Sequence, residues 1–163
     1  MKIQNLIATG IALLLTSCAQ SLNVKQKSEF DGYTGIIGVF RQPVGFCSGG
    51  YQQQIILGGE KIVVKPTWTS SQDNIFSAHL KSGSAELKQY HYSCGMTSTT
   101  LSPKFSAGVT IPGNGFCKIV ISFLPEDVKS GNIFQKNDIL LKDFFEKENV
   151  AIPYDDIPFC EPL

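Results

Sequence analysis

Short apolar runs separated by turn signals are the feature that most constrains the fold. From Phe30 onward, runs rich in β-branched and aromatic residues alternate with clusters of Gly, Pro, Ser and Asn. Turn signals at roughly 8–12-residue spacing favour a β-sandwich or barrel over βαβ units. We therefore expect a mostly β chain, an antiparallel β-sandwich of about seven short strands. The predicted strands are residues 33–41, 51–57, 60–65, 75–81, 85–92, 104–111 and 116–124.

Glycines refine the prediction at several points. Gly58-Gly59 predicts a tight turn that pairs residues 51–57 with 60–65, because paired glycines adopt the positive φ of hairpin turns. Residues 82–84 predict a second hairpin between 75–81 and 85–92. Within the first strand, Gly35 and Gly38 predict bulges or a close approach of another backbone. The Ser/Thr-rich stretch 93–103 is predicted to be a loop.

One amphipathic helix is expected near the C-terminus, over residues 138–149. Asn137 is a suitable cap, and Asp138 places a negative charge in the first turn, where it is favourable. Apolar residues then recur at helical spacing. We expect the helix to dock through one of two pairs, Leu141 with Phe145 or Leu140 with Phe144.

The N-terminus carries a different pattern. Lys2 precedes an apolar run over residues 6–15, which is about as long as the core of a signal peptide and too short to cross a membrane. Leu15-Thr16-Ser17-Cys18 then resembles the lipobox of bacterial lipoproteins. This resemblance implies that residues 1–17 are a signal peptide, that cleavage occurs before Cys18, and that Cys18 is acylated. The partner implied for this end is a membrane, reached through the lipid anchor.

The residues after Cys18 bear on location and domain boundaries. Ala19 follows Cys18, and in the lipoproteins of Gram-negative bacteria this favours the outer membrane, on its periplasmic or surface face. The polar residues that follow predict that 18–29 are the lipidated cysteine and a tether. Residues 30–163 are then expected to form a single β-sandwich domain.

Four further cysteines remain, namely Cys47, Cys94, Cys117 and Cys160. An even number in an exported chain predicts two disulfides, with three possible connectivities. We favour Cys47–Cys94 and Cys117–Cys160, because these pairs nest least. The alternative is that some remain free thiols. No two lie close enough in sequence for a typical zinc motif.

A short stretch resembles a hairpin of prealbumin-like sandwich modules, in which a Gly-Tyr strand ends at a glycine turn before an apolar strand. The matching residues are Gly50, Tyr51, Leu57, Gly59, Ile62, Val63 and Val64. The resemblance implies a sandwich and carries no function.

Charge and reactive side chains limit the function classes. The chain has 14 Lys and Arg residues against 14 Asp and Glu residues, and only 17% of its residues are charged, compared with about 25% in a typical domain. This balance argues against nucleic acid as a partner. His79, His91, Cys94 and Met96 offer copper-type donors, but their order differs from that of blue-copper sites and Cys94 is needed for the disulfides. We expect no metal, no cofactor and no enzymatic activity.

Trp68, the single tryptophan, lies in a polar segment between two predicted strands. Its ring either closes the end of the core or forms an exposed binding patch. The function expected first is a non-catalytic, lipid-anchored envelope protein that binds another envelope or secretion-system protein, through an exposed sheet edge for example. The alternative is a small-ligand or glycan-binding lipoprotein that uses the Trp68 region.

Overall fold

The computed structural model describes residues 21–42, 51–66, 73–94, 97–102 and 107–163. Cys18, Cys47 and Trp68 therefore lie outside the described residues. The strands are β1 (Thr34–Arg41), β2 (Tyr51–Leu57), β3 (Glu60–Pro66), β4 (Asp73–His79), β5 (Gly83–Cys94), β6 (Thr97–Leu101), β7 (Gly108–Ile111), β8 (Gly115–Ser122), β9 (Phe134–Gln135) and β10 (Glu161–Pro162). The helices are α1 (Pro125–Ser130) and α2 (Asp138–Glu148), with short 3-10 turns η1 (Lys27–Glu29) and η2 (Tyr154–Asp156).

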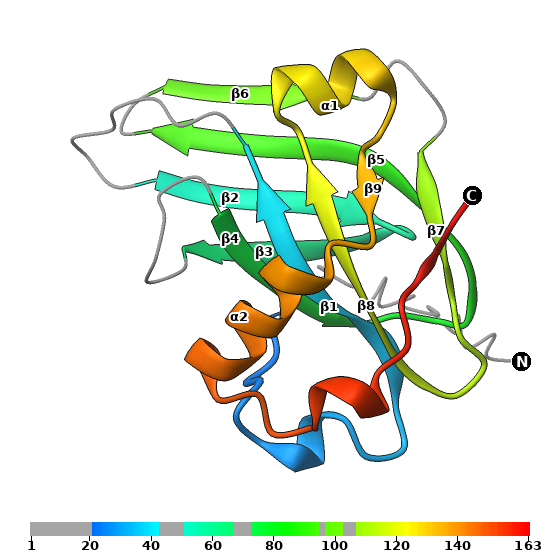
Figure 1. Cartoon of the computed structure of the whole chain (residues 1–163). Coiled ribbons are helices and arrows are strands. Elements are labelled where there is room, and N and C mark those ends of the chain that lie inside the picture. Colours follow the sequence, from blue (N-terminus) through cyan, green and yellow to red (C-terminus); the bar gives the residue numbers. More distant parts are fainter. Residues whose placement is uncertain (1–20, 43–50, 67–72, 95–96, 103–106) are drawn as a thin grey trace, which may run out of the picture.

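All ten described strands belong to one sheet, in the order β10-β7-β5-β2-β3-β4-β1-β8-β9, with β6 beside β5. The sheet curls until it is nearly a barrel (Figure 1). The mostly β prediction is confirmed, but a single sheet stands where two stacked sheets were expected. The sheet is also mixed, because β1 and β8 run parallel. Alternating apolar residues indicate a buried face, and that face packs equally well against a second sheet or inside a curled one.

The two predicted hairpins have opposite outcomes. The Gly58-Gly59 turn is confirmed, since both glycines have positive φ (59° and 85°) and Leu57 pairs with Glu60. The second hairpin is wrong, because β4 pairs with β3 and β1 whereas β5 pairs with β2, β6 and β7. The N–H of Leu80 donates to the carbonyl of Thr34 at 3.0 Å, which holds the end of β4 on β1.

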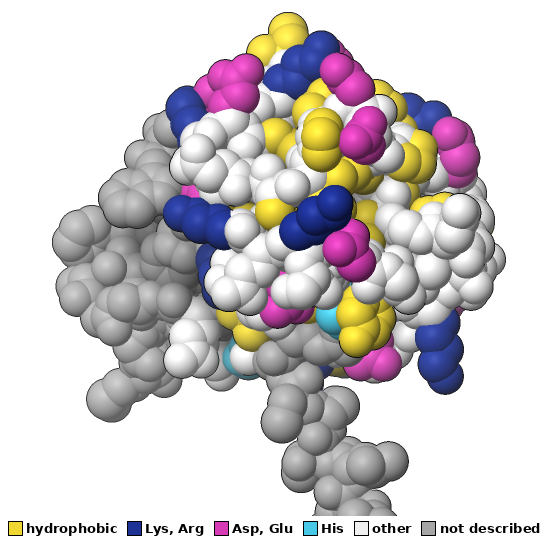
Figure 2. Space-filling view, turned by 90° about the horizontal axis from the view of Figure 1, so that it is seen from below, with side chains coloured by type: hydrophobic (Ala, Val, Ile, Leu, Met, Phe, Trp, Pro, Cys, Tyr) yellow, Lys and Arg dark blue, Asp and Glu magenta, His cyan; other side chains and the backbone are white. Residues whose placement is uncertain are grey.

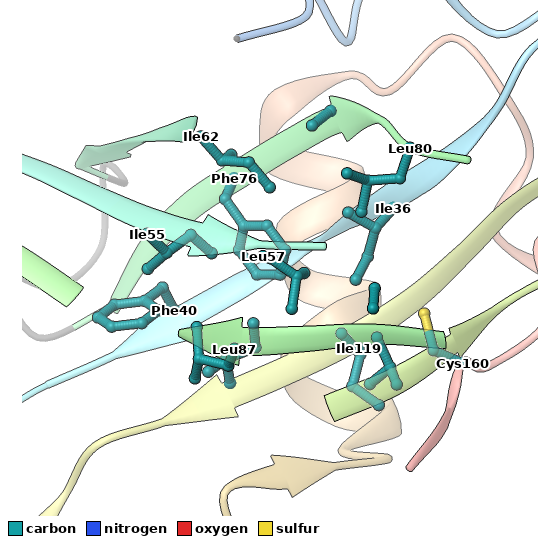
Figure 3. Close-up of a cluster of buried hydrophobic side chains, with 14 of the residues drawn as sticks. Ile36, Phe40, Ile55, Leu57, Ile62, Phe76, Leu80, Leu87, Ile119 and Cys160 are labelled. Atoms are coloured by element: carbon teal, nitrogen blue, oxygen red, sulfur yellow. The ribbon is translucent and has the colours of Figure 1, made fainter. Parts of the chain in front are cut away.

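Strand β1 is buried on both faces. Ile36 and Phe40 face the interior of the barrel, where they join the inner core, and Ile37 and Val39 face outward under α2. The close approach predicted at Gly38 is confirmed, because a Cβ there would lie 1.8 Å from the carbonyl oxygen of Ile119 on β8. Figure 3 shows side chains of the inner core meeting from several strands. The labelled members are Ile36, Phe40, Ile55, Leu57, Ile62, Phe76, Leu80, Leu87, Ile119 and Cys160.

Helix α2 covers the outer face of β1 and β8. The predicted cap is confirmed, since Asn137 Oδ1 accepts a hydrogen bond from the N–H of Leu140 at 3.1 Å. The helix docks through residues of both predicted pairs, because Leu141 and Phe145 of one pair and Phe144 of the other are buried. Helix α1, six residues that start at Pro125 and are followed by Gly131 in the left-handed conformation, was not among the elements predicted from the sequence.

Residues 21–29, which belong to the predicted tether, are described by the structure. From Ser21 onward the chain lies against the domain, and Val24 is buried in the outer cluster with α2. The carbonyl of Val24 accepts a hydrogen bond from the N–H of Ala151 at 2.8 Å. Leu22 and Val24, which precede the boundary predicted at residue 30, pack in the same cluster as α2.

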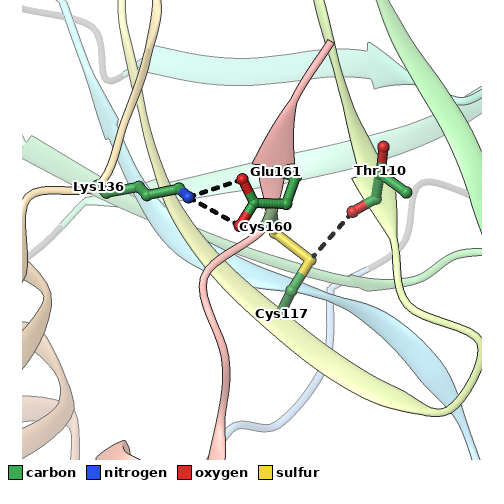
Figure 4. The surroundings of a disulfide bond; sticks show 5 residues. All are labelled: Thr110, Cys117, Lys136, Cys160 and Glu161. Carbon is green, nitrogen blue, oxygen red and sulfur yellow. Dashed lines mark hydrogen bonds and ion pairs between the residues drawn. A yellow bond between two sulfur atoms is a disulfide. The ribbon is translucent and has the colours of Figure 1, made fainter.

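The C-terminal segment closes the barrel. Phe159 pairs with Lys118 of β8, and β10 pairs with β7 on the other side. Cys160 of this segment forms a disulfide with Cys117 of β8, with a Cα–Cα distance of 4.9 Å (Figure 4). One of the two predicted disulfides is therefore confirmed. The predicted Cys47–Cys94 bond involves a residue outside the described ranges.

Candidate functional site

Strand β6 is an edge strand that the sequence analysis predicted to be a loop. Its sequence, TSTTL, pairs antiparallel with β5, with Thr97 opposite Cys94 and Leu101 opposite Tyr90. The signal that was available is its threonine content, because β-branched residues favour strands. A Ser/Thr-rich composition is equally typical of a loop. Backbone pairing with the edge of β5 is what makes these residues a strand.

The outer edge of β6 is paired with no strand in the described part of the chain. Five residues present roughly 17 Å of backbone, and the N–H and C=O groups of alternate residues point away from β5. Natural edges are usually protected by charge, proline or a covering element. The residues of β6 include neither a charge nor a proline.

A hollow of about 270 Å³ lies on the outer face of the sheet beside β6. Thr100 of β6 and His91 of β5 line it together, and His91 Nδ1 lies 3.0 Å from Thr100 Oγ1. The remaining lining residues are Gln54, Ile56, Lys61 and Gln89. Polar groups therefore border the edge on this face, where they can contact side chains of an added strand.

The interior of the barrel is also polar near this edge. Gln53 is 1% exposed, and among the described residues neither its amide nitrogen nor its amide oxygen has a hydrogen-bond partner. In register, Gln53 lies opposite Tyr92, two residues from Tyr90, whose ring is 4.9 Å from that of Phe40. A buried amide without a partner is unfavourable by about 1–3 kcal/mol, so Gln53 is an unusual choice for a core position.

The most perturbed titratable groups lie elsewhere, on the outer face of β8. Burial lowers the pKa of the Lys118 ammonium, and Asp155 and Asp138 partly offset this. Lys118 Nζ donates to the carbonyl of Tyr154 at 2.7 Å and lies 3.5 Å from the centre of its ring. Burial and the hydrogen bond to Asp138 raise the pKa of Tyr154. This network joins α2, η2 and β8, and we assign it a structural role.

The histidines considered as copper ligands lie on separate strands. His79, on β4, has Nε2 2.7 Å from the carbonyl oxygen of Glu29 and stacks on Tyr33. His91 is on β5, and β3 and β2 lie between those strands in the sheet. Among the residues with described positions, no group of three or more His, Cys, Asp or Glu side chains is placed to hold a metal ion.

No protein-family model, curated protein or solved structure matches this chain. In the described portion, no helix has both the length and the apolar character needed to cross a membrane. On the face seen in Figure 2, acidic and basic side chains are interspersed with apolar ones, without a large region of one sign. The functional proposal therefore depends on the geometry of β6 and its surroundings.

Proposed function

We propose that this chain is a lipid-anchored protein of the bacterial envelope, non-catalytic, that binds another envelope or secretion-system protein through strand β6. Two independent features support the two halves of the proposal. The lipobox-like Leu15-Thr16-Ser17-Cys18 after an apolar run supports the anchor. The unprotected outer edge of β6 supports the mode of binding.

The single observation that carries the binding proposal is the unpaired edge of β6 beside a polar hollow. An extended segment of a partner gains main-chain hydrogen bonds by adding to such an edge, and side-chain pockets then give specificity. Every second side chain of the added strand would lie on the same sheet face as the hollow bordered by Thr100 and His91. The near-neutral charge of the chain fits recognition by backbone pairing rather than by electrostatic steering.

The anchor is tested by Cys18→Ser. The expected result is loss of the acyl mass and accumulation of the uncleaved precursor, because the thiol is the acceptor of the lipid. Intact-mass spectrometry of protein from the envelope measures both. Mature protein with an unmodified residue 18 contradicts the anchor.

The binding mode is tested with photo-crosslinking side chains in cells. Ser98 and Thr100 are the exposed β6 positions, and Ile139, which is 83% exposed on α2, is the matched control. A discrete adduct with an envelope protein is expected from the β6 positions and none from Ile139. Adducts at Ile139 alone contradict the proposal.

Proline substitutions separate binding from folding. Alternate residues of an edge strand point their N–H toward and away from the neighbouring strand. Single prolines at positions 98, 99 and 100 should therefore divide into two classes. One class destabilises the domain, because it removes a hydrogen bond to β5. The other leaves thermal unfolding nearly unchanged but removes the crosslink. Retention of the crosslink in every stable proline variant overturns binding by strand addition.

A second candidate function is supported by Gln53. Its partnerless amide in the barrel interior suits a small polar ligand, which corresponds to the alternative of a small-ligand or glycan-binding lipoprotein with Trp68 nearby in sequence to β3. Trp68→Ala discriminates the roles of the ring. A binding role predicts ligand affinity weakened by more than about 1–2 kcal/mol with unchanged unfolding. A core lid, which we favour, predicts destabilisation by roughly 3–5 kcal/mol.

A further inference from the structure

A pocket of about 330 Å³ lies on the outer side of the sheet, between the N-terminal segment, β3, β4 and the end of α2. Pockets for small ligands usually occupy about 300–1,000 Å³. Leu22 and Ile75 contribute apolar wall, whereas Ser77 and Glu148 contribute oxygen atoms. The pocket is separate from β6 and from the hollow beside it.

Two side chains that line this pocket, Glu148 and Ser77, carry oxygen acceptors without a partner among the described residues. Glu148 is 8% exposed and Ser77 is 4% exposed. Within the described residues, neither the Glu148 carboxylate nor the Ser77 hydroxyl makes a hydrogen bond or ion pair. Glu148 is also the last residue of the eleven-residue helix α2, where the helix dipole adds partial negative charge. The interior of the pocket therefore favours a cation that donates hydrogen bonds.

The rim of the pocket has the opposite sign. Lys25 and Lys65 line it, both are exposed, and neither forms an ion pair with a described residue. They come from different elements, the N-terminal segment and β3. A ligand with an ammonium group at one end and an anionic group a few atoms away fits a negative interior and a positive rim.

The position of the pocket indicates where that ligand comes from. Ser21, which lines the pocket, follows Cys18 by three residues, and three residues span at most about 11 Å. If Cys18 is lipidated, as the proposed function requires, the pocket mouth is held next to the lipid headgroups.

We infer that this pocket binds the phosphoethanolamine headgroup of a membrane phospholipid, with the ammonium at Glu148 and Ser77 and the phosphate at Lys25 and Lys65. A primary ammonium offers three N–H donors to these oxygens. A choline headgroup offers none, and quaternary ammonium groups are typically held by aromatic rings. Among the described residues, Phe76 is the only aromatic one that lines the pocket, and its side chain belongs to the inner core. This inference depends on the proposed anchor and adds a lipid specificity to it.

The test uses the full lipidated chain, purified from membranes and reconstituted in nanodiscs with equal amounts of phosphatidylethanolamine and phosphatidylcholine. Native mass spectrometry after release in detergent reads the covalent acyl mass and any retained phospholipid in one spectrum. The expected result is a retained phosphatidylethanolamine. Glu148→Gln should reduce its retention about tenfold or more, because a charge-assisted hydrogen bond is lost. Glu146→Gln, an exposed position on the same helix turn, should leave retention unchanged.

Lys65→Gln is the second variant, at an exposed strand position where folding is not at risk. It should reduce retention of the same lipid. Equal retention of the two phospholipids, or retention insensitive to both Glu148→Gln and Lys65→Gln, overturns the inference while an acyl mass on Cys18 upholds the anchor. A chain without that mass overturns the anchor instead. Titration with water-soluble glycerophosphoethanolamine and glycerophosphocholine then measures binding to the pocket without a bilayer. Equal affinity for the two compounds again overturns the inference.

Discussion

Strands β6 and β7 pair with the same edge of β5, at its two ends. The far edge of β7 is covered by another strand, whereas the far edge of β6 is open in the described part of the chain. Strand β7 is paired on its far side by β10, and the N–H of Leu163 donates to the carbonyl of Gly108 at 3.0 Å. Strand β6 has no such cover in the described part of the chain. Both strands are short, so length does not explain the difference.

The covered side shows what closing an edge requires. The C-terminal segment supplies backbone pairing to β8 and β7, the Cys117–Cys160 disulfide and an ion pair between Lys136 and Glu161 at 2.7 Å. In the described part of the chain, the side of β6 has none of these, and β6 lacks even the charges that commonly protect an edge. The contrast supports the view that the edge of β6 is kept for a partner.

Removing the disulfide is expected to have the largest effect on the covered side. The two cysteines are separated by 43 residues, and loop-closure entropy for such a loop corresponds to roughly 4 kcal/mol. Joint replacement Cys117→Ser and Cys160→Ser should lower the free energy of unfolding by about that amount. Urea unfolding measures it. An unchanged midpoint would mean that β10 and its neighbours close the barrel without the covalent bond.

The N-terminal segment should be the next most important contributor. Phe30 is 4% exposed, and its ring centre lies 4.9 Å from that of Phe116 on β8. Phe30→Ala should destabilise the domain by about 3 kcal/mol, since it leaves a cavity. The matched control is Ile139→Ala, at an exposed position, with an expected change within about 0.5 kcal/mol. Equal effects of the two changes would show that residues before β1 contribute little.

In the barrel interior near β6, a substitution should raise the free energy of unfolding instead of lowering it. Gln53→Leu replaces a buried amide that has no partner with an apolar group of similar size, so the free energy of unfolding should rise by about 1 kcal/mol. Gln54→Leu, at the neighbouring position on the outer face, is the control and should give no gain. Destabilisation by Gln53→Leu would show that the amide is satisfied in solution.

The smallest effect concerns pH and the outer face of β8. Hydrogen bonds from Lys142 and from the Tyr154 hydroxyl, the latter at 2.7 Å, lower the pKa of the Asp138 carboxyl from its ordinary value of 3.8. The folded state therefore binds this proton less tightly than the unfolded state. The resulting stabilisation is present above pH 3.8 and is lost as the pH falls through the lower folded-state pKa. NMR titration of the carboxyl carbon measures the shift, and Asp138→Asn should remove this part of the acid dependence.

The sequence by itself determined the features that depend on neighbouring residues. Gly58-Gly59 specifies its turn because glycine accepts positive φ, and Asn137 specifies the start of α2 because its side chain accepts an early N–H. Cysteine parity and spacing favoured the Cys117–Cys160 bond among three possible connectivities, and the structure selected it.

Only the tertiary structure decided how these elements meet. The parallel pairing of β1 with β8, the separation of β4 from β5 and the placement of Val24 under α2 all join residues far apart in sequence. Alternating apolar residues specify that a face is buried and leave open what covers it. The open edge of β6 and the acceptors around Glu148 are of the same kind, since each becomes visible only when distant strands, helix and N-terminal segment are assembled.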